Sequence, residues 1–214
     1  MIDWNMAMSD ALAARIFSSV WQVGGLGCAI LLALLAAAAW FDVRLHRIPN
    51  KLVFAGALVA LLLHLVLPQG AGFVSAMPGG LGLLDALAGL GIGFGVFLPL
   101  YCLHVMGAGD VKLMAMVGAY LGSEQIWGAL FGVALAGGVL AIVIALRRGI
   151  FVRMLRNIQA GLYGSLSQVL MGGMPTFDYS AQPTAQLPYG VAIALGTLGY
   201  LTWQASSVGL IHLS

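Results

Sequence analysis

Two aspartates interrupt an otherwise apolar chain at points where a charge is costly. Asp42 closes a long apolar segment and lies in the run FDVRLHRIPNK over 41–51, and Asp110 lies in HVMGAGDVKLMAMVG over 104–118. An ionised carboxylate costs about 2.5–3.5 kcal/mol at the centre of a membrane helix on insertion scales. A chain in which only 7% of the residues are charged needs a reason to keep such groups. Asp42 and Asp110 are therefore candidates for chemistry.

A pair of carboxylates can hydrolyse an amide bond without a metal ion or a covalent intermediate. Two carboxylates that lie close together cannot both ionise cheaply, so they share a proton. One of them then acts as a general base on a water molecule while the other acts as an acid. Glycines flank Asp110 at Gly107 and Gly109, and they expose backbone that a peptide chain can approach. The sequence predicts an acid–base pair if the fold brings the two aspartates together.

Each of these residues also has a structural interpretation that the residue types leave open. Asp42 can be a charge at a helix end, and Asp110 can be an N-cap. Carboxylates in membrane proteins also serve proton- or cation-coupled transport, although a transporter needs them near the middle of the membrane. A non-catalytic membrane component of a secretion or pilus apparatus is a further alternative. Lys112 points elsewhere on the helix than Asp110, so we expect it to shape the site or to meet lipid headgroups.

The composition predicts an all-α, polytopic membrane protein. Of the 214 residues 61% are hydrophobic, and the charged fraction of 7% compares with about 25% in soluble domains. We expect a single integral-membrane domain over 1–214. Cys28 and Cys102 both fall in apolar segments and form no CxxC pair, so neither a zinc site nor a disulfide framework is indicated. We expect membrane lipid as a partner and no cofactor, metal ion or nucleic acid, and the sequence leaves the oligomeric state open.

Six apolar segments predict about six transmembrane helices. They cover residues 20–41, 52–67, 82–104, 111–121, 126–146 and 188–210. A short lead-in occupies 1–19, and a segment with amphipathic and loop character occupies 147–187. Pro49 requires a turn after the first span, and Gly122 begins the turn between the fourth and fifth.

The basic residues predict which end of the bundle faces the cytoplasm. Eight of the nine Lys and Arg residues fall in three clusters, at 44–51, Lys112 and 147–156, and only Arg15 lies elsewhere. With six spans all three clusters lie on one side, which the positive-inside rule makes cytoplasmic. Both aspartates then lie at the cytoplasmic face, so we expect the active site there.

Glycines in the third apolar segment predict close packing against a neighbouring helix. Gly89 and Gly93 form one small-xxx-small pair, and Gly91 and Gly95 form a second. The alternative is that glycine is simply common in membrane helices.

The motifs around the two aspartates resemble those of the type IV prepilin peptidases, the GxGD aspartic proteases of the membrane. The resemblance rests on DxRxxxIPN over 42–50 and GAGDVK over 107–112, with a similar LPYG over 187–190, and it covers about 40–196. It implies that Asp42 and Asp110 are the catalytic residues. It also implies an enzyme of the bacterial inner membrane that removes the short basic leader of prepilins, after a Gly, at the cytoplasmic face. Such processing serves pilus assembly or type II-like secretion.

One departure from the family pattern indicates a subgroup. Bifunctional members carry an additional N-terminal segment with two CxxC pairs, linked to N-methylation of the new pilin N-terminus. This sequence has no CxxC pair, so it is more similar to the compact, peptidase-only members that serve Flp/Tad-type pili. We therefore expect no methyltransferase activity.

Overall fold

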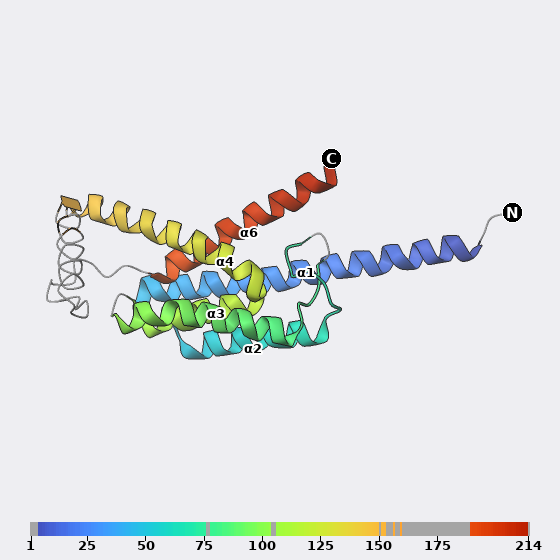
Figure 1. Cartoon of the computed structure of the whole chain (residues 1–214), viewed down its shortest axis with the longest axis horizontal. Coiled ribbons are helices and arrows are strands. Elements are labelled where there is room, and N and C mark those ends of the chain that lie inside the picture. The colour runs from blue at the N-terminus through green and yellow to red at the C-terminus, as the bar shows by residue number, and fades with distance from the viewer. Residues whose placement is uncertain are drawn as a thin grey trace, which may run out of the picture. The chain divides into compact units, whose positions relative to one another are not determined.

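The computed structural model is built from helices. It describes residues 4–75, 78–103, 106–149, 151–152, 156, 159 and 189–213. The helices are α1 (Trp4–Leu45), α2 (Asn50–Val66), α3 (Leu83–Cys102), α4 (Ala108–Arg147) and α6 (Tyr189–Leu213) (Figure 1). The expected all-α class is confirmed, and from Trp4 onward the predicted lead-in is continuous with the first span as helix α1.

The chain divides into two compact units. The first comprises Met1–Ala136 with Pro188–Ser214, and the second comprises Gly137–Leu187. Both aspartates belong to the first unit. The segment predicted for 147–187 lies largely outside the described residues, and the expectation of a single domain stays a prediction.

Several of the helices are long and apolar enough to cross a membrane. Among the described residues these are Gly25–Leu45 of α1, together with α3 and α4, and α2 is a shorter apolar helix of 17 residues. Each of the six predicted spans coincides in large part with a helical segment. The chain is a membrane protein, and the count of six crossings stays a prediction.

The predicted turn at Gly122 is a sharp change of direction inside α4. Gly122 has φ 75° and ψ −177°, which is not helical and lies in a region that glycine adopts at little cost. The helix that resumes after it has unpaired N–H groups in its first turn. Asp85 of α3 accepts hydrogen bonds there from the Ser123 backbone N–H, at 3.4 Å, and from the Ser123 hydroxyl. Asp85 thus caps the second part of α4 from a neighbouring helix.

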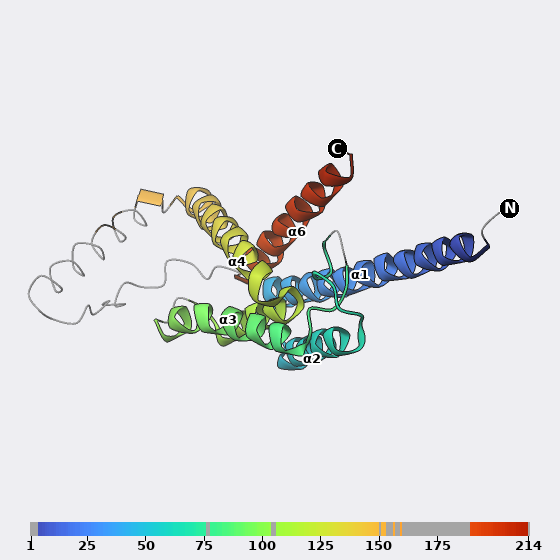
Figure 2. The ribbon, with the colours of Figure 1, turned by 45° about the vertical axis from the view of Figure 1, so that its right-hand side comes forward.

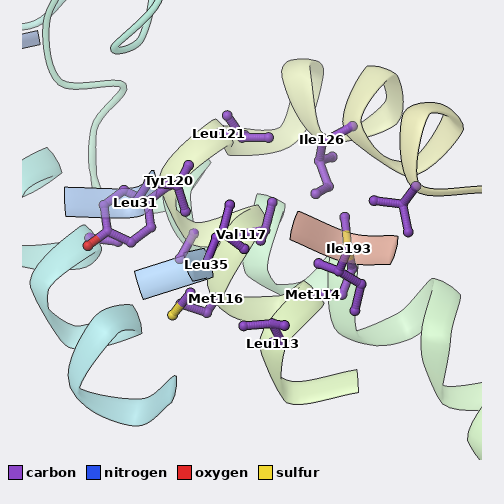
Figure 3. Packing of buried hydrophobic residues seen from close by; sticks show 14 of the residues in the cluster. Leu31, Leu35, Leu113, Met114, Met116, Val117, Tyr120, Leu121, Ile126 and Ile193 are labelled. Atoms are coloured by element: carbon purple, nitrogen blue, oxygen red, sulfur yellow. The ribbon is translucent and has the colours of Figure 1, made fainter. Parts of the chain in front are cut away.

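The first part of α4 is the central helix of this unit. All residues over 113–122 are buried, so this helix is covered on every side. Figure 3 shows side chains of α4 such as Met114 and Val117 surrounded by Leu31 and Leu35 of α1 and by Ile193 of α6. A helix that is apolar all round is stable in the interior of a protein. This explains why the predicted span of 111–121 is shorter than a membrane crossing. The segment is surrounded by other helices, whereas a helix surrounded by lipid would need to be longer.

The outer helices present apolar side chains outward. On α2 the buried residues are Val53, Gly56, Ala60 and His64, whereas the exposed ones include the larger apolar side chains. These are Phe54, Leu58, Leu62, Leu65 and Val66. A soluble helix shows the reverse arrangement, with polar residues outside. The outer face of α2 is therefore suited to lipid.

Only one of the two predicted glycine pairs on α3 is used for packing. Gly89 lies against the backbone of Gly118, and Gly93 lies against the backbone of Met114, so α3 and α4 approach closely. Among the described residues, no heavy atom of a neighbouring element lies within 4 Å of the position that a Cβ would take on Gly91, and the same holds for Gly95. The close approach predicted from the spacing is confirmed for Gly89 and Gly93.

A buried histidine joins three elements at the end of the bundle where α3 begins. The Nδ1 atom of His64 accepts a hydrogen bond from the Leu81 N–H at 3.0 Å, and Nε2 lies 3.2 Å from the Tyr120 carbonyl oxygen. Since Nδ1 accepts, Nε2 carries the proton and donates to Tyr120. The ring also stacks on Phe73 with a centroid separation of 4.6 Å.

Replacing His64 with Ala is expected to lower the free energy of unfolding by about 2–4 kcal/mol, because the change removes two hydrogen bonds and leaves a cavity. The measurement is thermal unfolding of the purified protein in detergent. Leu65→Ala is the control, since Leu65 is the neighbour of His64 on α2 and is exposed. An unchanged melting temperature in His64→Ala would contradict the bridging role.

Candidate active site

Asp42 lies in the last turn of α1 and is held by the start of α6. α1 continues to Leu45, so this aspartate is part of the helix and does not follow it. Its side chain is buried, with 8% of its surface exposed. The backbone N–H of Gly190 donates a hydrogen bond of 2.8 Å to Oδ2 of Asp42. The end of α1 and the start of α6 lie side by side in both views (Figure 1, Figure 2).

Asp110 lies in the first turn of α4, as expected from the break at 107–109. Its side chain is buried to the same degree as that of Asp42. The backbone N–H of Gly107 donates a hydrogen bond of 3.1 Å to Oδ2 of Asp110, and the Asp110 N–H donates one of 3.1 Å to the Gly107 carbonyl. The first of these bonds is one half of a capping box, in which a side chain of the first turn returns to the residue before the helix, and the second joins backbone to backbone because Gly107 has no side chain. The helix dipole favours a carboxylate at this position.

The fold places these two buried carboxyl groups near enough for the charge of one to act on the other. The residues come from different helices, α1 and α4, at the end of the bundle where α6 also begins. Neighbouring buried carboxyl groups favour a state in which one is ionised and the other is protonated, so the arrangement is suited to general acid–base chemistry. Among the described residues no group of three or more His, Cys, Asp or Glu is placed to hold a metal ion.

The two glycines beside Asp110 occupy different surroundings. A Cβ on Gly107 would lie 3.4 Å from Oδ2 of Asp110, and the residue is otherwise exposed. A Cβ on Gly109 would lie 3.3 Å from the Cβ of Ile48. Gly109 therefore lets the segment before α2 pack against the start of α4. Backbone that a peptide can reach is present at Gly107, whereas the side chain of Ile48 packs against Gly109.

Lys112 connects the start of α4 to the start of α2. Its Nζ atom donates a hydrogen bond of 3.1 Å to Oδ1 of Asn50 and lies 5.6 Å from the centroid of the Phe54 ring. The ammonium group thus has contacts within the protein, and the expected contact with headgroups stays a prediction. The hydrogen bond between Lys112 and Asn50 also places two of the predicted basic clusters, 44–51 and Lys112, at the same end of the bundle.

Lys112→Ala is expected to have a modest effect. An exposed hydrogen bond and a cation–π contact contribute about 0.5–1.5 and 0.5–1 kcal/mol respectively. The melting temperature should fall by a few degrees, and cleavage of a leader peptide, the activity that the resemblance implies, should stay within about tenfold of the wild type. Lys51→Ala, which removes a charge from the same end, is the control. A loss of activity as large as that of an aspartate variant would mean that Lys112 takes part in the chemistry.

The sequence does not predict that Gly190 bonds to Asp42 or that Asn50 bonds to Lys112. Gly190 belongs to the LPYG segment at 187–190, where the only signal is the motif itself. Asn50 belongs to the IPN run, and nothing in its neighbourhood indicates a bond to Lys112. Gly190 is 148 positions from Asp42, and Asn50 is 62 positions from Lys112, so the local sequence pattern does not reveal either contact.

Comparison with known proteins bears on the identity of this site. The sequence model of the type IV leader peptidase family matches residues 29–142, which include both Asp42 and Asp110. No curated protein and no solved structure matches the chain. The family match covers more than half of the 214 residues and contains both aspartates. The chain therefore belongs to the type IV leader peptidase family.

Proposed function

We propose that this protein is an aspartic endopeptidase that removes the leader peptide of Flp-type prepilins at the cytoplasmic face of the bacterial inner membrane. Membership of the family implies aspartic protease activity in general. The observation that carries the proposal is the pair of buried carboxyl groups, Asp42 and Asp110, which lie at one end of the bundle near enough for the charge of one to act on the other. Processing of this kind supports pilus assembly or type II-like secretion.

In the proposed reaction the two aspartates act as base and acid and then exchange these roles. The ionised carboxylate takes a proton from a water molecule, whose oxygen forms a bond to the carbonyl carbon of the scissile peptide. The protonated carboxyl group gives its proton to the carbonyl oxygen, and a tetrahedral diol results. In the second step the first group gives its new proton to the amide nitrogen while the other takes a proton from a diol hydroxyl, the C–N bond breaks, and the products are a new carboxyl group and a new amine. Gly107 supplies exposed backbone next to Asp110 that an extended peptide can approach.

The distribution of charge supports the cytoplasmic face. Lys112 lies beside Asn50, so the basic residues of 44–51 and Lys112 belong to the end of the bundle that holds the aspartates. By the positive-inside rule that end faces the cytoplasm. The leader of a prepilin is also on this side before cleavage, and its membrane-embedded part would lie beside the apolar outer faces of the helices.

The test is cleavage of a Flp-type prepilin by the protein in membranes. The wild type should convert the prepilin to a shorter product, which a gel separates and mass spectrometry identifies. The double variant Asp42→Asn/Asp110→Asn should insert normally and give no product. Glu124→Gln is a matched control, because Glu124 is exposed and lies beyond the turn at Gly122. Processing by the double variant would support a non-catalytic assembly component, and ion flux in proteoliposomes without processing would support a transporter.

Cleavage is expected to pass through a maximum as the pH is varied. The base must be ionised and the acid must be protonated, so the rate falls at low pH when both carboxyl groups hold a proton and at high pH when neither does. The measurement is kcat/KM for a leader peptide in detergent across the pH range, with inserted protein and melting temperature checked at each pH. A flat profile would contradict a pair that shares one proton.

A further inference from the structure

The surroundings of Asp42 explain how a carboxyl group can be kept at the end of a helix that disfavours it. Asp42 lies in the last turn of α1, where the negative end of the helix dipole opposes an anion. Asp110 lies in the first turn of α4, where the dipole favours one. Asp42 therefore needs donors from another element, whereas Asp110 obtains its donor from the residue just before its own helix.

α6 supplies such a donor. The backbone N–H of Gly190 donates a hydrogen bond to Oδ2 of Asp42. Gly190 belongs to the first turn of α6, whose N–H groups have no partner within the helix. The Asp42 side chain thus caps α6 from another helix, in the way an N-cap residue caps its own.

Asp42 lies so close to Gly190 that there is no room for a side chain at residue 190. A Cβ there would lie 2.8 Å from Oδ2, 3.0 Å from Cβ and 3.1 Å from Cγ of Asp42. Carbon atoms in ordinary contact are about 3.5–4.0 Å apart. Any other residue at this position must push the Asp42 side chain or the start of α6 away by roughly 0.5–1 Å.

We propose that Gly190 is a positioning residue for Asp42: its N–H holds Oδ2, and its lack of a side chain lets the carboxyl group take its place beside Asp110. This rests on the proposed catalytic role of Asp42. It makes the start of α6 part of the active site, although α6 lies outside the 29–142 region that the family match covers.

The first experiment compares Gly190→Ala with Gly199→Ala. Both change a glycine of α6 to alanine, but in the part of the chain that the structure describes a Cβ on Gly199 meets no heavy atom of another element within 4 Å. Gly190→Ala should lower kcat by about 100-fold, as a misplacement of about 1 Å does, with little change in KM. The pH profile of its remaining activity should change shape, because the contact that orients and solvates the Asp42 carboxyl group is altered. Gly199→Ala should behave as the wild type.

A second experiment keeps the proposal testable if Gly190→Ala is poorly folded. Asn at position 42 keeps a side-chain oxygen that can accept the Gly190 N–H, whereas Ala does not. Backbone hydrogen exchange at 190–192 should therefore be about tenfold faster in Asp42→Ala than in Asp42→Asn. Exchange at the start of α3 should be the same in both variants.

These outcomes separate the positioning role from the function on which it depends. A Gly190→Ala enzyme with the kcat and pH profile of the wild type would overturn the positioning role while leaving the peptidase intact. Equal exchange at 190–192 in the two Asp42 variants would overturn it as well. Leader cleavage that survives in both Asp42→Asn and Asp110→Asn would instead overturn the peptidase proposal itself.

Discussion

Changing either Asp42 or Asp110 to Asn is expected to reduce leader cleavage by at least about 10³-fold. A general acid or base contributes about 10²–10⁴-fold to a rate, and loss of one member of this pair removes both functions, because each depends on the proton held by the other. Asn has nearly the same shape as Asp and still accepts a hydrogen bond, from Gly190 at position 42 or from Gly107 at position 110. The fold should therefore survive. The measurement is the initial rate of cleavage by equal amounts of inserted protein.

The double variant provides an internal check on this prediction. When two residues act as a unit, removing both costs about as much as removing one. Asp42→Asn/Asp110→Asn should therefore be no slower than either single variant, within about threefold. Multiplicative losses in the double variant would indicate two independent contributions. A single variant that keeps a tenth or more of the wild-type rate would exclude that residue from the acid–base step.

Gly89→Ala is expected to produce a large loss of stability. A Cβ at this position would lie 2.6 Å from the carbonyl carbon and 2.7 Å from Cα of Gly122, and closer still to the carbonyl oxygen of Gly118. These are backbone atoms of α4, so no side chain can turn aside to make room. Overpacking of a core costs about 1–3 kcal/mol, and the rigid neighbours favour the upper part of that range. The melting temperature in detergent should fall by about 5–10 °C.

Gly91→Ala is the matched control for that experiment. Gly91 lies on the same helix, and a Cβ there meets no heavy atom of another element within 4 Å. Alanine also has a higher helix propensity than glycine by about 1 kcal/mol, so Gly91→Ala should be neutral or stabilising. Equal melting temperatures for Gly89→Ala and Gly91→Ala would contradict the close approach of α3 to α4 at Gly89.

The sequence by itself predicts the helical segments and identifies the two aspartates as candidate site residues. Apolar segments of adequate length must form helices in lipid, because the backbone has no other partner for its hydrogen bonds there. The turns at Pro49 and Gly122 follow from the restricted or permissive backbone of those residues, and both occur where predicted. Asp42 and Asp110 can be recognised as candidate site residues in the sequence, because an ionised group is costly in an apolar chain.

Only the tertiary structure decided which apolar faces are inside. Lipid and protein interior are equally apolar, so hydropathy cannot show that 113–122 of α4 is surrounded by other helices. For the same reason the spacing of Gly89 and Gly93 is no different from that of Gly91 and Gly95, although only the first pair meets a neighbouring backbone.

The contact between Asp42 and Gly190 is also decided only by the tertiary structure, but for a different physical reason. The two residues are 148 positions apart, and the bond joins a side chain to a backbone N–H that every residue except proline possesses. No residue type or periodicity marks such a donor in advance. The sequence determined that two carboxyl groups lie at helix ends, whereas the packing of α6 against α1 decided what holds Asp42 in place.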